Sequence, residues 1–122
     1  MELNELLFNI FKELGIEVAQ DEYLGKQSKY ATFTYYDEQP TSWADNEVTS
    51  DTAYLQIQFV VPKNYDYFAE KKAIRNALEH NGFIIINGET FLSDVYSGTE
   101  KKRTCVWNVK YTEMRGEYLW HL

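Results

Sequence analysis

The chain has 122 residues, a length typical of one domain, with a formal net charge of -7 and one cysteine. An acidic balance argues against a nucleic-acid binder, which needs basic residues to neutralise phosphates. Because Cys105 stands alone, no disulfide can form within the chain, as expected in a reducing compartment. No run approaches the roughly 18 apolar residues of a membrane span, and no basic-then-apolar leader opens the sequence. We therefore expect a soluble, intracellular protein without membrane contact.

The N-terminal third predicts one helix and two strands. Apolar residues recur with helical spacing between Met1 and Leu14, and Gly15 follows as a stop signal. Residues 16–23 predict a short, weak strand. Tyr30 to Tyr36 is rich in aromatic and hydroxyl side chains, which predicts a firm strand.

The stretch from Asp51 to Gly82 predicts the centre of the core. Its first part, Asp51 to Pro62, alternates, which is typical of a strand with one buried face. The residues on that face are Ala53, Leu55, Ile57, Phe59 and Val61. Asn64 to Asn81 predicts an amphipathic helix, with Asn64 or Asp66 as its cap and Gly82 after its end.

Three further elements are expected downstream. Phe83 to Ile86 begins a buried strand, and Asn87-Gly88 is either a tight turn between two short strands or a kink in one longer strand. Ser93 to Arg103 reads as a hairpin loop. Cys105 to Glu113 predicts the last firm strand, with Cys105, Trp107, Val109 and Tyr111 on one face.

Strands joined by hairpins around two helices indicate an α+β fold. We expect an antiparallel or mixed β-sheet with two helices packed on one face. Residues 1–122 form a single domain, in which 116–122 is a possible C-terminal arm: Tyr118 to Leu122 would be a further edge strand or a contact arm.

The region from Asp37 to Ser50 predicts the longest irregular segment, and with Asp51 it is acidic throughout. It holds no Lys or Arg, and its carboxylates are Asp37, Glu38, Asp45, Glu47 and Asp51. Long loops are often functional. A solvated connection with Trp43 folded onto the core is the alternative, and the sequence does not choose between them.

Catalytic and metal-binding residues are not expected. Cys105 lies in an alternating strand, where a free cysteine usually acts as a small buried hydrophobe, and His80 sits at a predicted helix end. Two histidines and one cysteine far apart offer no metal-ligand spacing. No glycine-rich phosphate cradle appears, so no cofactor is predicted.

A charge pattern predicts contacts between copies. The acidic region could meet the basic cluster Lys101, Lys102 and Arg103 of a neighbour, head to tail, as a ring requires. The residues of this hypothetical oligomer interface are Asp37, Glu38, Trp43, Asp45, Glu47, Asp51, Lys101, Lys102 and Arg103. The same carboxylates could instead face the lumen of a ring and repel DNA.

The order of these features resembles a family of phage and prophage tail proteins of the tail terminator, or tail completion, type, including prophage minor structural proteins. The resemblance spans roughly Glu2 to Glu113. It rests on the features that follow, in order: a helix ending at Leu14-Gly15-Ile16, an aromatic strand at Tyr30 to Tyr36, Trp43-Ala-Asp-Asn46, a strand at Tyr54 to Phe59, a charged helix after Lys63, and a strand near Val106 to Tyr111.

The resemblance implies a non-enzymatic structural protein. Such proteins form a ring, typically of six subunits, which caps the tail tube and presents a docking surface to the head. The implied partners are other copies of the chain, a tail tube protein and a head connector protein, with no sequence-specific nucleic-acid binding and no membrane. The implied location is the virion tail, assembled in the cytoplasm of the bacterial host.

Other functions fit the same residues. A head-closure or neck connector protein would share these features. A small monomeric module that holds a peptide or ligand between sheet and loop would use its tyrosines and tryptophans as a pocket lining. An enzyme depending on Cys105 is the least favoured of these possibilities.

Overall fold

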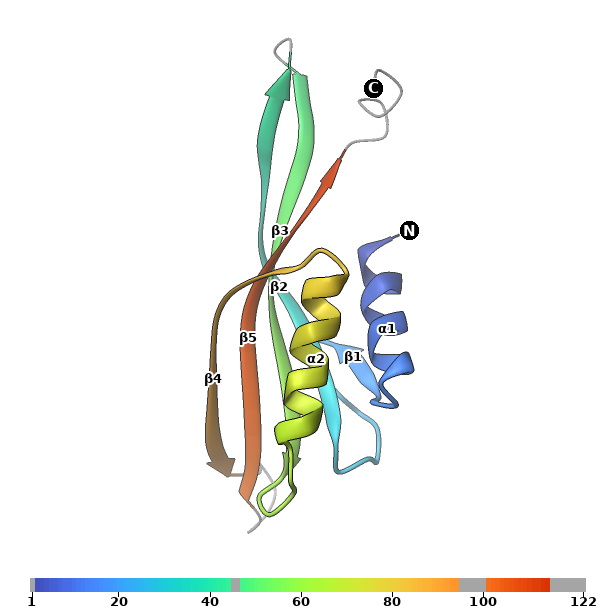
Figure 1. Cartoon of the computed structure of the whole chain (residues 1–122), viewed down its shortest axis with the longest axis vertical. Coiled ribbons are helices and arrows are strands. Elements are labelled where there is room, and N and C mark those ends of the chain that lie inside the picture. Colours follow the sequence, from blue (N-terminus) through green and yellow to red (C-terminus); the bar gives the residue numbers. More distant parts are fainter. Residues whose placement is uncertain (1, 45–46, 95–100, 115–122) are drawn as a thin grey trace.

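The protein is an α+β structure in which two helices cover one face of a five-stranded mixed sheet (Figure 1). The computed structural model describes residues 2–44, 47–94 and 101–114. Its elements are α1 (Leu3–Glu13), β1 (Val18–Gln20), β2 (Tyr30–Ala44), β3 (Glu47–Pro62), α2 (Phe68–His80), β4 (Ile84–Asp94) and β5 (Lys101–Met114). This confirms the predicted fold class. Neither helix of the described ranges is long and apolar enough to cross a membrane.

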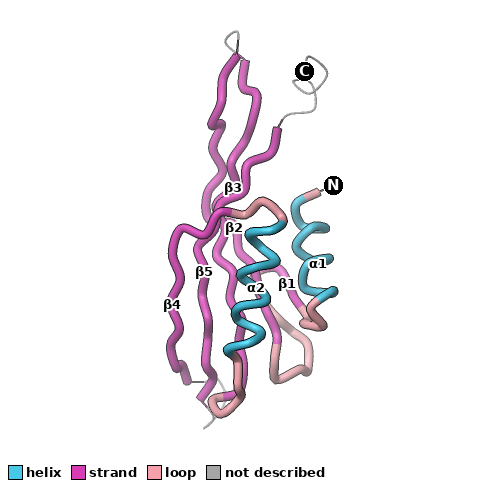
Figure 2. Tube along the Cα trace, viewed as in Figure 1, coloured by secondary structure: helices cyan, strands magenta, loops and turns pink. Residues whose placement is uncertain are grey.

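The strand order is β1-β2-β3-β5-β4. β1 runs parallel to β2, and the other pairs are antiparallel, which makes the sheet mixed. Figure 2 shows the two helices as one layer in front of the strands, and the β2–β3 hairpin extending past them. The sheet narrows toward that end, because β1 reaches only Phe33 of β2 and β4 reaches only Lys110 of β5.

The core lies between the helices and the facing side of the sheet. The alternating face predicted for β3 is confirmed, with Leu55, Ile57, Phe59 and Val61 fully buried and Ala53 packed beside them. Leu7, Ile10 and Phe11 of α1 and Ile74 and Leu78 of α2 cover it. Cys105, Trp107 and Val109 of β5 face the same cluster, as predicted, and Tyr111 packs against it.

The ends of both helices follow from local sequence. α1 ends before Gly15, whose φ of 73° is in the left-handed region that glycine tolerates, and the Ile16 N–H then donates to the Phe11 carbonyl. α2 begins at Phe68, later than predicted, because residues 63–67 form a turn after β3. Asp66 accepts a long hydrogen bond of 3.4 Å from the Phe68 N–H, so it contributes weakly to the start of the helix.

The prediction of an irregular region at 37–50 is wrong. Residues 30–44 and 47–62 are two long strands, paired out to Ala44 and Glu47. Their apolar alternation breaks because the hairpin leaves the core, and register shifts after Tyr35, Pro40 and Ser42 interrupt the pairing. Pro40 is tolerated because β2 is an edge strand beyond its short pairing with β1. Asp45 lies outside the described residues.

The downstream predictions are corrected at two points. Asn87-Gly88 does not separate two strands: β4 is continuous and carries a register shift between Ile85 and Asn87, as the kink alternative predicted. The hairpin loop predicted for 93–103 is too long, because β4 runs to Asp94 and β5 begins at Lys101. The cluster Lys101 to Arg103 is therefore strand, stabilised by pairing with Leu92 to Asp94. The possible arm 116–122 lies outside the described residues.

The packing of β3 against both helices predicts a large cost for a cavity there. Phe59→Ala should lower the free energy of unfolding by about 3–5 kcal/mol, because Phe59 is fully buried. Urea unfolding followed by tryptophan fluorescence measures this difference. Leu24→Ala is the control, since Leu24 is 83% exposed, and it should change stability by no more than about 0.5 kcal/mol. An equal effect of the two substitutions would contradict this packing.

Candidate functional site

A cleft opens where the start of α1 meets the root of the β2–β3 hairpin, and its volume is about 810 Å³. Four carboxylates from four elements or their flanks line it: Glu2, Glu38, Asp51 and Glu113. None of the described residues in its lining is Lys or Arg. We call this region the acidic cleft.

The register of the sheet brings these carboxylates together. Asp51 of β3 lies directly opposite Glu113 of β5, and Glu38 of β2 lies opposite Ala53. The register shift between Tyr35 and Asp37 decides which acid enters the cleft, since a one-residue shift exchanges the two faces of a strand. It places Glu38 on the face of Tyr35. Asp37 instead accepts hydrogen bonds from the Glu38 N–H at 2.9 Å and the Gln39 amide at 2.7 Å.

Tyr35 connects the cleft to α1. Its hydroxyl donates to Asn4 Oδ1, and Asn4 Nδ2 donates to Gln20 Oε1 at 3.2 Å, so α1, β1 and β2 are joined through polar side chains. Burial raises the pKa of Tyr35 to about 12, and the negative charges of Glu38, Glu113 and Glu2 act in the same direction. The hydroxyl therefore stays protonated, as a donor, through neutral pH.

The opposite end of the sheet is basic. Lys101, Lys102 and Arg103 begin β5, and Lys102 lies opposite Pro62, the last residue of β3. Lys101 and Lys63 are exposed, and Lys63 lies in the turn after β3. Lys102 Nζ lies 3.5 Å from the Ser28 carbonyl oxygen. We call this region the basic end.

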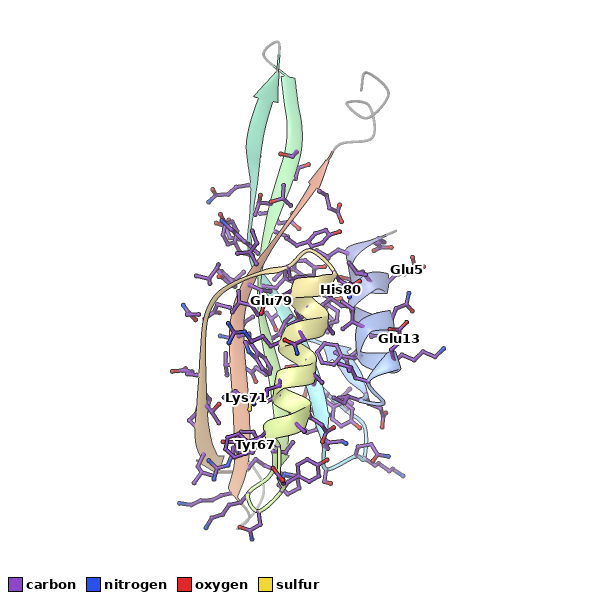
Figure 3. All side chains as sticks on the ribbon, in the orientation of Figure 1. Glu5, Glu13, Tyr67, Lys71, Glu79 and His80 are labelled. Atoms are coloured by element: carbon purple, nitrogen blue, oxygen red, sulfur yellow. The ribbon has the colours of Figure 1, made fainter. Side chains whose placement is uncertain are left out.

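Aromatic rings support part of the basic end. The Arg103 guanidinium lies 5.4 Å from the centre of the Tyr67 ring and the Lys71 ammonium 5.9 Å from it, both within cation–π range. Figure 3 shows Tyr67 and Lys71 at the start of α2, far from Glu79 and His80 at its end. Arg103 is thus held in its own chain, whereas Lys101 points its charge into solvent.

Five of the nine predicted interface residues lie in these two regions. Glu38 and Asp51 line the acidic cleft, and Asp37 is exposed beside it. Trp43 and Glu47 belong to the far part of the hairpin, where their backbones pair with Val48 and Ala44. Lys101, Lys102 and Arg103 form the basic end. Along β3 the two regions are separated by the eleven residue steps from Asp51 to Pro62, or about 36 Å at 3.3 Å per step.

The groups considered for catalysis do not line the cleft. Cys105 is fully buried in β5, and this burial raises the pKa of its thiol. His80 is exposed in the last turn of α2. Within the described ranges, no three His, Cys, Asp or Glu side chains are grouped so that they could hold a metal ion.

Glu2, Tyr35 and Glu113 are among the cleft residues that sequence reasoning missed. They come from the N-terminal helix and two strands, and only the folded sheet brings them together. The opposition of Asp51 and Glu113 depends on the β3–β5 register, which spans 62 positions of the sequence. No local pattern in the sequence contains that information.

Comparison with known proteins does not identify a function. No protein-family model and no curated protein matches the sequence. One solved structure, of a protein designated only by a sequence identifier, aligns over 94% of this chain and 97% of its own, with 8% identity and a TM-score of 0.46. This likeness is too distant to bear on function.

The raised pKa of Tyr35 predicts a loss of stability at alkaline pH. An unfolded tyrosine ionises near pH 10, so between about pH 10 and pH 12 the unfolded chain releases a proton that folded Tyr35 keeps. Stability is therefore present below pH 10 and falls as the pH rises through this window. Tyr35→Phe should reduce that fall, while costing about 1 kcal/mol at pH 7 through the lost bond to Asn4.

Urea unfolding at pH 8, 10 and 11.5 measures the effect. Tyr36→Phe is the matched control, because Tyr36 is exposed and its replacement leaves Tyr35 in place. This control should keep the wild-type dependence on pH. A Tyr35→Phe protein with the same alkaline loss as the wild type would show that Tyr35 does not hold its proton as described.

Proposed function

We propose that this protein is a non-enzymatic structural component of a phage or prophage tail, similar to tail terminators that cap the tail tube as a ring. The sequence resemblance suggests the class. The observation that carries the proposal is the separation of charge along the molecule, with the acidic cleft at one end of β3 and the basic end at the other.

Charge separation of this kind favours head-to-tail association. About 36 Å is several times the Debye length of about 8 Å at physiological salt, so the two ends of one chain do not neutralise each other. Glu38 and Glu113 are exposed in the lining of the cleft, where their carboxylates can pair with cations. The basic end of a second copy supplies such cations in Lys101 and Lys102.

A head-to-tail contact uses two different surfaces of each subunit, so it forms a closed ring or an open filament. A ring of six copies matches the resemblance, with the tail tube protein on one side and the head connector protein on the other. In such a ring, carboxylates that remain on the lumen would repel passing DNA. A head-closure or neck connector role would use the same subunit contact and differs in which neighbour is bound.

The cleft itself supports a second candidate, a monomeric module that binds a peptide. Its volume of about 810 Å³ is within the range of ligand pockets, and Tyr35 and Tyr111 lie in its lining. Four carboxylates would select a lysine- or arginine-containing peptide. Titration calorimetry with a short oligolysine peptide, against a glutamate control peptide, tests this. Saturable binding by a protein that stays monomeric would favour the module.

The ring proposal predicts that reversing charge at either end blocks assembly. Glu38→Lys with Glu113→Lys should weaken self-association by more than about tenfold, because two lysines would then face the basic end of the neighbour. Lys101→Glu with Lys102→Glu should weaken self-association to a similar extent. Combining all four substitutions should restore assembly, since the charges are then exchanged. Light scattering over a range of protein concentration, alone and with tail tube protein, measures the mass.

The control is Glu13→Lys with Glu22→Lys, two exposed acidic residues that do not line the cleft. This protein should assemble as the wild type does and show the same circular dichroism. Assembly should also weaken as salt is raised, because exposed ion pairs are screened. A wild-type protein that stays monomeric under all these conditions, or a reversed variant with unchanged rings, would overturn the proposal.

A further inference from the structure

The face of the sheet that points away from the helices carries no charged residue at its centre. Both described helices pack on the side to which Leu55 points, so its neighbour Gln56 points to the other side. We call this other side the outer face, which is turned away from the viewer in Figure 2. Segments 30–36, 54–60 and 104–108 pair at its centre and contain no charged residue, although 25% of the chain is charged. Depletion of charge is typical of a surface that binds something.

A row of neutral polar side chains crosses the outer face. Thr34 of β2 lies opposite Gln56 of β3. Gln56 lies opposite Asn108 of β5, which in turn lies opposite Asn87 of β4. The four residues therefore span three strand spacings, or about 14 Å. They line a shallow depression of about 420 Å³ together with Tyr36, and we call them the polar row.

Charged side chains flank the polar row, and both signs occur among them. On one side, Asp37 and Lys110 both lie opposite Tyr54. On the other side, Glu89 lies opposite Val106. A phosphate or carboxylate ligand is held best by several cations, and a cationic ligand by several carboxylates close together. These flanking charges provide neither arrangement, so the composition of the outer face favours an uncharged ligand.

The amides of the outer face are oriented by hydrogen bonds to each other. Asn108 Nδ2 donates to Asn87 Oδ1 at 2.7 Å, and Gln58 Nε2 donates to Gln56 Oε1 at 2.9 Å. Each bonded pair leaves the amide oxygen of one residue and the NH2 group of the other. Within the described part of the chain, neither of these remaining groups takes a further hydrogen bond. The polar row thus offers donors and acceptors side by side, in orientations that are already fixed.

Tyr36 adds an aromatic surface beside the polar row. It is the extra residue at the register shift between Tyr35 and Asp37. Its side chain is 55% exposed, and its ring centre lies 6.2 Å from that of Tyr54. The negative face of such a ring attracts the C–H groups of a sugar ring, which are weakly positive. The sugar hydroxyls then remain available to neighbouring polar groups.

We propose that the polar row and Tyr36 form a binding site for a neutral oligosaccharide. A hydroxyl group both donates and accepts hydrogen bonds, which matches the mixed donors and acceptors that the row leaves. Its extent across four strands suits a chain of sugar rings rather than a single ring. The inference does not rest on the proposed role in a tail, because the site contains no residue of the acidic cleft or the basic end.

NMR of nitrogen-labelled protein tests the site directly, because the NH2 groups of Gln56, Asn87 and Asn108 give signals of their own. The probes are maltotriose, cellotriose and triacetylchitotriose. At least one should shift these signals saturably, with a dissociation constant of about 1 mM, because the depression is shallow. Sorbitol is the control solute: it carries hydroxyls but no ring, so it should cause no saturable shift.

Two substitutions at exposed positions should weaken this binding. Tyr36→Ala removes the aromatic surface and Asn87→Ala removes an amide of the row, so each should raise the dissociation constant about five- to tenfold. Tyr36→Phe keeps the ring and should bind nearly as the wild type does. Asn76→Ala, at an exposed asparagine of α2, is the matched control. Circular dichroism should show that all four proteins are folded.

Four results would overturn the proposal. No saturable shift with any of the three oligosaccharides, up to tens of millimolar, would mean that the outer face does not bind sugars. Equal shifts with sorbitol, or at Asn76, would mean that the effect is not specific. Unchanged binding by folded Tyr36→Ala and Asn87→Ala would place the sugar elsewhere. Signals of the row that move only on dilution of the protein would mean that a second copy covers this face. The charge-reversed variants above leave the site intact, so their assembly does not decide this test.

Discussion

The structure depends on the pairing of β3 with β2 on one side and β5 on the other. β3 is the longest strand, and its buried face carries the apolar residues on which both helices pack. The same strand extends past the core into the hairpin, where it holds Asp51 opposite Glu113. The pairing of β3 therefore positions the apolar face of the core, and it also sets the distance between the acidic cleft and the basic end.

The sequence alone predicted the helices and strands in which burial imposes a repeating apolar pattern. The period of two from Ala53 to Val61 predicted the central strand and its inward face, and the spacing of Leu3, Leu7 and Phe11 predicted α1. The prediction failed beyond Asp37, because the β2–β3 hairpin there extends past the helices and its strands are held by pairing with each other. Patterns that depend on burial carry no signal for such strands.

The candidate site was only partly predictable for a different reason. Asp37, Glu38 and Asp51 were recognised because they are close in sequence, but the residue that opposes Asp51 is Glu113. The bulge at Tyr36 then exchanges the roles of neighbouring acids, so that Glu38 lines the cleft and Asp37 caps backbone and amide groups beside it. Both facts follow from register, which a single sequence does not specify over such separations.

The most direct measurement mixes two charge-reversed proteins. Glu38→Lys with Glu113→Lys puts two lysines in the cleft, and Lys101→Glu with Lys102→Glu puts two carboxylates at the basic end. Each alone should be monomeric by light scattering, and an equimolar mixture should assemble into alternating rings. Glu13→Lys with Glu22→Lys gives the same net charge of -3 (-7 plus 4) as the first protein but keeps the acidic cleft, so this control should assemble alone as the wild type does. A mixture that stays monomeric, or a charge-reversed protein that assembles alone, would contradict the account.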